Sequence, residues 1–222
     1  MKKETNRDGD TALDFKEIQS SPYTFNISRQ HWGSHLYNFE NRYDRYDAKL
    51  FAKLELIVDK LLSFDPEVCP RYVFLCGVPG NGKTHFMVGL YRALVKKKGY
   101  AGGNGATFIE FRELIADMIQ GFDSKIPIRT ALSAWTKPRV LLIDDITSGE
   151  RLLKEGSMEQ TVLRDIFIER YETKGTLVVS TNMLWPELNQ FISTNLGEYV
   201  SSRTTDSIVA QFPKIDFRRR KQ

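Results

Sequence analysis

One short segment of this sequence has the residue types that hold phosphate groups. It begins with a glycine, passes through a second glycine and ends in Gly-Lys-Thr. Glycines at these places let backbone N–H groups turn toward phosphate oxygens, where a Cβ would collide. The lysine would reach the β- and γ-phosphates, and the threonine hydroxyl is a ligand for Mg²⁺. The segment therefore predicts a site for ATP and Mg²⁺, with nucleotide contacts from Gly77, Val78, Pro79, Gly80, Asn81, Gly82, Lys83, Thr84 and His85.

Two adjacent acids further along the chain fit the metal and the reaction. Asp144 and Asp145 follow four apolar residues, 140–143, which places both carboxylates at the carboxyl end of a buried strand. Parallel sheets bind their ligands at that end. We expect Thr84 to ligate Mg²⁺, Asp144 to hold the ion through a water molecule, and Asp145 to orient and deprotonate the attacking water. The second acid favours hydrolysis by water over transfer to a substrate hydroxyl.

A polar residue after another strand could complete the site. Asn182 follows the strand-like segment TLVVS with one residue between them. If that strand lies between the phosphate-loop strand and the Asp144 strand, Asn182 lies between Lys83 and Asp145. It would then hydrogen-bond the γ-phosphate or the attacking water. The alternative is that Asn182 only forms a turn.

The elements that must position these residues alternate along the chain. Apolar residues at helical spacing predict a helix from residue 47 to about 63, and another helix follows the glycine loop. Five β-favouring segments lie at 71–76, 107–111, 139–144, 176–180 and 207–212, with helical patterns at 112–122 and 157–172 between them. This alternation predicts an α/β protein with a mostly parallel five-stranded sheet and helices on both faces.

The composition excludes several classes of protein. The chain has 222 residues, 41% of them hydrophobic and 27% charged, enough for one core of ordinary composition. No apolar stretch approaches the roughly 18 to 20 residues that span a membrane, and the polar start lacks a secretory signal. We therefore expect a cytoplasmic protein without membrane association. Two cysteines are too few for a disulfide framework or a structural zinc site.

Four segments together resemble the DnaC-type helicase loaders of the AAA+ ATPases and their IstB-type relatives. They are GVPGNGKT, VLLIDDI, FIERYETKGTLVVSTN and LGEYVSSR, and the similarity extends over nearly all of residues 25–218. The last two segments are the most specific. The resemblance implies a three-layer P-loop NTPase, an AAA+ core of the ASCE type, without a full C-terminal helical lid. It divides the chain into a polar, flexible segment (1–24), the ATPase core (25–215) and a basic tail (216–222).

The resemblance also implies roles for single residues. Asn182 takes the place of the sensor-1 residue, and Arg203 that of the arginine finger, which reaches the γ-phosphate bound by a neighbouring subunit. A finger supplied in this way requires self-association into a ring or spiral. Tyr199 stands where the family often has a second arginine. The alternative for Arg203 is an ion pair on the surface.

The implied function is ATP-dependent loading of a hexameric, DnaB-like replicative helicase onto single-stranded DNA. Lys125, Arg129, Lys137 and Arg139 lie where this clade inserts a DNA-facing helix, near Trp135. One alternative is an IstB-like transposition helper that binds DNA and a transposase. Others are a small-molecule kinase and a nucleotide-gated adaptor. The short segment ahead of the core suggests an origin in a phage or mobile element.

Overall fold

The computed structural model describes residues 27, 31, 33–39, 46–63, 65–98, 105–123, 128–147, 154 and 156–217. The polar segment 1–24 and most of the basic tail, 218–222, lie outside the described residues.

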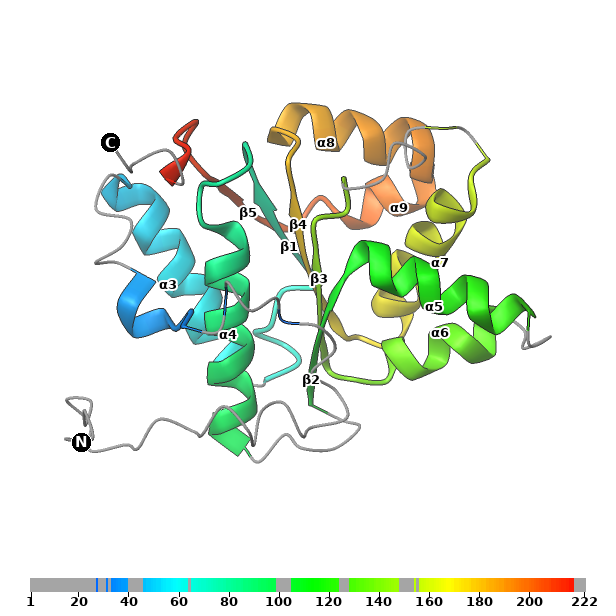
Figure 1. Cartoon of the computed structure of the whole chain (residues 1–222), viewed down its shortest axis with the longest axis horizontal. Coiled ribbons are helices and arrows are strands. Elements are labelled where there is room, and N and C mark those ends of the chain that lie inside the picture. Colours follow the sequence, from blue (N-terminus) through cyan, green and yellow to red (C-terminus); the bar gives the residue numbers. More distant parts are fainter. Residues whose placement is uncertain are drawn as a thin grey trace.

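A single sheet of five parallel strands forms the centre of the described chain (Figure 1). The strands are β1 (Tyr72–Cys76), β2 (Ala106–Glu110), β3 (Val140–Asp144), β4 (Thr176–Thr181) and β5 (Ile208–Gln211), in the order β2-β3-β4-β1-β5. Every residue of β1, β3 and β4 is buried. Strands covered on both faces need continuous apolar sequences, which is why these segments lack the alternation of a half-exposed strand. The predicted five-stranded parallel sheet is confirmed.

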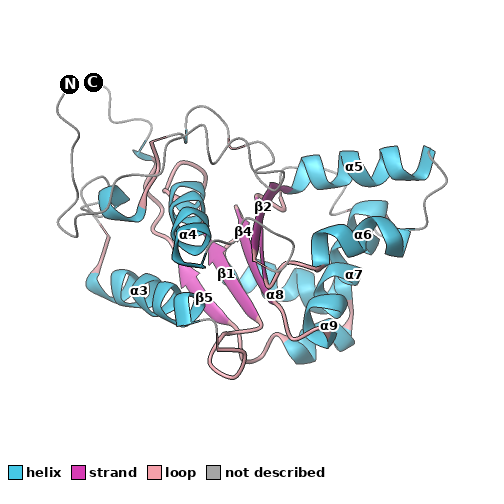
Figure 2. Ribbon diagram, turned by 90° about the horizontal axis from the view of Figure 1, so that it is seen from below, coloured by secondary structure: helices cyan, strands magenta, loops and turns pink. Residues whose placement is uncertain are grey.

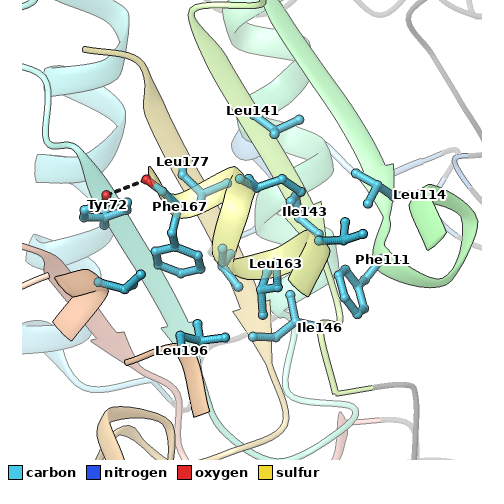
Figure 3. Close-up of a cluster of buried hydrophobic side chains, with 14 of the residues drawn as sticks. Tyr72, Phe111, Leu114, Leu141, Ile143, Ile146, Leu163, Phe167, Leu177 and Leu196 are labelled. Carbon is cyan, nitrogen blue, oxygen red and sulfur yellow. Dashed lines mark hydrogen bonds between the residues drawn. The ribbon is translucent and has the colours of Figure 1, made fainter. Parts of the chain in front are cut away.

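Helices cover both faces of the sheet (Figures 1 and 2). One face packs against η2 (Leu36–Asn38), α3 (Ala48–Ser63) and α4 (Lys83–Lys98). The other packs against α5 (Phe111–Asp123), α6 (Ile128–Thr136), α7 (Met158–Glu172), α8 (Trp185–Phe191), η4 (Ile192–Leu196) and α9 (Glu198–Arg203). Alternate residues of β1 face opposite layers: Val73 and Leu75 contribute to the α4 side, and Tyr72 and Phe74 to the α7 side. In Figure 3 the Tyr72 hydroxyl donates to the Phe167 carbonyl of α7 across this second layer, at 2.8 Å.

Three helices occupy segments for which the sequence pattern gave no helix. α6 fills the place where the resemblance implies an extra helix, and its Trp135 is only 8% exposed, within the core. α8 and α9 are short and are joined by a π-helical turn, so their apolar residues do not keep one helical period. After β5, residues 212–217 contain no α-helix.

A buried arginine ties the amino-terminal ends of β3 and β4 together. Arg170 of α7 is 1% exposed, and its guanidinium donates to the four carbonyls of Thr136, Pro138, Arg139 and Thr176, at 2.5–2.9 Å. Burial lowers the pKa of Arg170 to about 10, so the group remains protonated at neutral pH. Within the described ranges, no helix has the length and apolar character needed to cross a membrane.

Candidate functional site

The glycine loop, residues 77–82, connects the end of β1 to the start of α4. Gly77, Gly80 and Gly82 have φ angles of 137°, 78° and 97°. Residues with a Cβ rarely adopt such angles, so each of these glycines permits a turn that other residues would strain. A loop of this shape can direct consecutive backbone N–H groups toward one anion.

The C-terminal strand and the loop after it support the glycine loop. The Phe217 N–H donates to the Gly80 carbonyl at 3.0 Å, and the Phe212 N–H donates to the Cys76 carbonyl at 2.8 Å. A Cβ at Gly77 would lie 2.9 Å from the Phe212 carbonyl oxygen, so the two segments approach as closely as backbone allows. The Tyr46 hydroxyl donates to the Asn81 carbonyl. Segments from both ends of the described chain therefore hold the loop in place.

Lys83 lies at the start of α4 with its ammonium against the loop. The side chain is only 6% exposed. Its Nζ donates to the carbonyls of Gly77 and Val78, at 2.5 and 2.9 Å, and to Asn81 Oδ1 at 3.0 Å. The charge is thus held at the loop whose phosphate it is expected to bind.

Thr84 and Asp144 meet although 60 residues separate them in the sequence. Thr84 Oγ1 donates to Asp144 Oδ2 at 2.8 Å. Two neighbouring ligands of an octahedral Mg²⁺ ion lie about 3.0 Å apart when each bond is about 2.1 Å long. The two oxygens therefore fit Mg²⁺ in both chemistry and spacing, and Asp144 is close enough to Thr84 to bind the ion directly rather than through the expected water molecule.

Ser180 holds the other oxygen of Asp144. Its hydroxyl donates to Asp144 Oδ1 and accepts from the Asp145 N–H at 2.8 Å. Burial raises the pKa of Asp144, while the hydrogen bonds from Ser180 and Thr84 lower it. Sequence analysis gave Ser180 no role. It is a polar residue at the end of a buried apolar strand, and that position is the feature that could have identified it.

Asn182 lies beside Asp145, since β4 runs between β1 and β3 as the prediction required. Asn182 Nδ2 donates to Asp145 Oδ1 at 3.0 Å, and Thr147 Oγ1 donates to the same oxygen at 2.8 Å. Thr147 also accepts from the Asn182 N–H at 3.0 Å. The φ of Asp145 is 50°, a strained value for a residue with a Cβ. The acid, the amide and the hydroxyl thus form one network at the carboxyl edge of the sheet.

His85 follows Thr84, but its imidazole faces away from the glycine loop. Its Nε2 lies 2.8 Å from Asn38 Oδ1 and 3.3 Å from the His35 carbonyl, and the ring packs edge-on against Phe39. Any contact between His85 and a phosphate therefore falls to its backbone N–H in the first turn of α4.

Arg203, at the end of α9, is not brought to its own glycine loop. α9 packs on the opposite face of the sheet from α4, and β5 begins at Ile208 beside Val73, near the amino end of β1. The guanidinium carbon lies 3.3 Å from the centroid of the Tyr199 ring and 4.9 Å from that of Tyr171. Among the described residues Arg203 makes these ring contacts and no ion pair with a carboxylate.

The residues expected to contact DNA are only partly described. Lys125 and the side chain of Arg129 lie outside the described part. Lys137 is exposed and Arg139 is half-buried, and both precede β3, whereas Asp144 ends it. These two side chains therefore belong to the sheet edge opposite the glycine loop.

Comparison with known sequences gives one distant relative. No family model matches the chain. An uncharacterized protein of Bacillus subtilis (strain 168), YqaM, is 27% identical over 140 residues, which cover 62% of this chain and 42% of that protein. The chain thus matches less than half the length of this relative.

Comparison with solved structures identifies the fold. The crystal structure of the DnaC helicase loader aligns with a TM-score of 0.62 and 21% identity, over 84% of this chain and all of that one. AMPPCP-bound DnaA from Aquifex aeolicus aligns with a TM-score of 0.61 and 17% identity, over 81% of this chain and 50% of that one. The predicted fold, a five-stranded parallel sheet with helices on both faces, is confirmed, as is the resemblance to DnaC at the level of the fold.

Proposed function

From the fold shared with the DnaC helicase loader, we propose that this chain is an AAA+ ATPase that loads a replicative helicase onto single-stranded DNA. It would bind ATP with Mg²⁺ in the glycine loop and hydrolyse ATP as a ring or spiral of subunits. The observation that carries the ATPase part is the 2.8 Å contact between Thr84 and Asp144, since it joins the phosphate loop to a buried carboxylate with the spacing of two magnesium ligands.

Different residues of one subunit bind the phosphates and the cation. Backbone N–H groups of residues 80–84 and the Lys83 ammonium hold the phosphates, and Thr84 and Asp144 hold the cation. Bound Mg²⁺ would neutralise charge that develops on the phosphates. Ser180 keeps the Asp144 carboxylate in the orientation that this requires.

Asp145 and Asn182 would act on the water molecule that attacks the γ-phosphate. Asp145 accepts its proton, and Asn182 fixes the carboxylate through the 3.0 Å hydrogen bond. An aspartate is one methylene shorter than a glutamate, so the backbone of Asp145 must lie closer to the attacking water molecule.

Arg203 would act on the nucleotide of a neighbouring subunit. Its position on the α7–α9 face, opposite α4, leaves it remote from its own loop and available to a second copy. A guanidinium is planar and permanently charged, which suits it to stabilise charge on the transferred phosphoryl group. A head-to-tail contact of this kind generates a ring or a helical assembly.

ATP binding tests the first step of the proposal. Wild-type protein should bind ATP with Mg²⁺ in titration calorimetry, and Lys83→Ala should weaken binding at least about tenfold because the phosphates lose a charged donor. Lys97→Ala removes an exposed lysine from the same helix and should bind like the wild type. Equal binding by Lys83→Ala and the wild type would contradict the assignment of the loop.

Partner capture tests the second step. Immobilised single-stranded DNA should retain this protein together with a hexameric replicative helicase when ATP is present, and should retain neither with Lys83→Ala. Capture of a transposase instead would indicate a transposition helper. Phosphoryl transfer to a small-molecule hydroxyl would indicate a kinase and would contradict the loader proposal.

A further inference from the structure

Two tyrosines from different helices enclose the Arg203 guanidinium. Tyr199 lies one turn earlier on α9, and its ring centroid is 3.3 Å from the guanidinium carbon. Tyr171 belongs to the last turn of α7, with its centroid at 4.9 Å. Arg203 Nη1 also donates to the Tyr199 carbonyl at 2.8 Å. The guanidinium is therefore oriented by the two ring contacts and by the hydrogen bond from Nη1 to the Tyr199 carbonyl.

Both tyrosines are unusually open to solvent for residues of their size. Tyr171 is 40% exposed and Tyr199 is 47% exposed, and the other large apolar side chains at this level in the described ranges, Leu56, Val68 and Ile119, lie on other elements. Two exposed rings beside one arginine form a small aromatic surface. Tyrosine and arginine are enriched where proteins contact one another.

Part of the guanidinium has no acceptor within the described chain. Nη1 donates to Tyr199 and to Ser202 Oγ at 3.3 Å, whereas Nε is buried without a hydrogen-bond partner, and Nη2 has no acceptor among the described residues. Nη2, unlike Nε, is not buried, so it can donate to a phosphate oxygen supplied from outside this subunit.

We propose that Tyr199 and Tyr171 are positioning residues that hold Arg203 in the orientation in which it reaches the nucleotide of a second copy of this chain. The inference rests on the proposed function, in which Arg203 acts in trans. Stacking fixes the plane of the guanidinium and leaves Nη2 open to the phosphate. Tyr199 thus supplies a contact of its own at a place where the family often has a second arginine.

The tyrosine rings would assist Arg203 by preorganisation. A free arginine side chain has many rotamers, and ordering it against a phosphate costs conformational entropy. Ring contacts that order the side chain beforehand reduce this loss. Removing a ring should therefore slow turnover without weakening the binding of ATP in the subunit that carries the change.

The first test measures ATPase kinetics of Tyr199 variants. Tyr199→Leu keeps an apolar side chain but loses the π-face, and its kcat should fall about fivefold with KM for ATP unchanged. Tyr199→Phe keeps the ring and should stay within about twofold of the wild type. Tyr171→Leu should act in the same direction with a smaller effect, since its ring is further from the guanidinium. A matched change at an exposed apolar residue elsewhere, Leu56→Ala, should have no effect.

The second test mixes subunits and separates a role in trans from a merely structural one. A Lys83→Ala subunit has no working loop but carries intact Arg203, Tyr199 and Tyr171. Added to Tyr199→Leu, it should raise ATPase activity, because an intact loop that lies beside a Lys83→Ala subunit then meets an intact Arg203 with both of its tyrosines. The double variant Lys83→Ala/Arg203→Ala should give no such rise.

The outcomes distinguish the positioning role of the tyrosines from the role of Arg203 in trans. If Arg203→Ala loses activity and Lys83→Ala restores it in mixtures, while Tyr199→Leu equals the wild type, the tyrosines do not position Arg203. If Tyr199→Leu is slow but mixing does not restore it, the ring acts within its own subunit and the inference is wrong. If Arg203→Ala itself turns over normally, the finger in trans is wrong as well.

Discussion

Asn182 Nδ2 and Asp145 Oδ1 lie 3.0 Å apart, so the residue after β4 holds the carboxylate that follows β3. The Thr147 hydroxyl donates to the same oxygen, and Thr147 accepts from the Asn182 backbone. Because Asp145 adopts a strained φ of 50°, these contacts have to hold a backbone that would otherwise relax. The contact between the two residues therefore fixes where the Asp145 carboxylate, the proposed proton acceptor, lies relative to the glycine loop.

Replacement of Asn182 should affect the reaction rather than ATP binding. We expect Asn182→Ala to lower kcat about tenfold to a hundredfold, because Asp145 loses a donor and the reacting water loses a polar neighbour. The dissociation constant for ATP, from titration calorimetry, should change less than about threefold. Asn189→Ala, an exposed change on α8, is the control. Lost nucleotide binding, or an unchanged kcat, would contradict this role.

Replacement of Ser180 should show in the requirement for magnesium. Ser180→Ala leaves Asp144 Oδ1 without its donor, so the carboxylate is less well oriented toward the cation. The Mg²⁺ concentration for half-maximal ATPase activity should rise about tenfold. A titration with magnesium at saturating ATP measures it, with the exposed Ser193→Ala for comparison. A lower maximum at the same half-saturation would show that Ser180 acts on something other than the metal site.

Replacement of Arg170 should destabilise the whole fold. Arg170→Met removes the donor to four carbonyls at the starts of β3 and β4, so the free energy of unfolding should fall by about 2–4 kcal/mol. Urea unfolding followed by circular dichroism measures it. Arg164→Ala, an exposed arginine on the same helix, should change stability by less than about 0.5 kcal/mol.

A substitution of Gly175, which lies against the Arg170 guanidinium, tests the same hydrogen bonds. A Cβ at Gly175 would lie 2.2 Å from the guanidinium carbon, so Gly175→Ala should also destabilise the protein by displacing it. If Gly175→Ala and Arg170→Met both unfolded like the wild type, Arg170 would contribute nothing to the free energy of unfolding.

Stability should depend on the protonation of His35. Burial, together with the nearby Arg92 guanidinium, lowers the pKa of His35 to about 4 from an ordinary 6.5. Between these values the unfolded chain binds a proton that the folded chain does not, so stability should fall as pH is lowered from about 6.5 to 4. Melting temperatures measured across this range should fall less steeply in His35→Asn. Identical slopes for the two proteins would contradict the assignment.

Much of the fold was predictable because the strands are buried on both faces. The middle residues of segments such as 140–144 and 176–180 have to be apolar, and the glycine loop, the acid pair and Asn182 lie at or just after the ends of such segments. The position of Asn182 near Asp145 followed once β4 was placed between β1 and β3. Periodicity thus located the main elements to within about two residues.

What the sequence did not predict depends on contacts between distant segments. Ser180 and Thr147 are ordinary hydroxyl residues until the strand order brings them beside the acids. α8 and α9 were not recognised since a π-helical turn interrupts their period. The imidazole of His85 could not be placed because its neighbours, Asn38 and His35, come from a segment without a regular pattern.

The hydrogen bonds from Phe212 to Cys76 and from Phe217 to Gly80 have a consequence for biosynthesis. A ribosome makes the glycine loop in the first half of the chain, but the strand and turn that back it are made more than 130 residues later. A nascent chain that ends before residue 208 therefore carries the whole glycine loop but lacks the segment that supports it. If ATP binds in this loop as proposed, it would stabilise only chains that have been translated through Phe217.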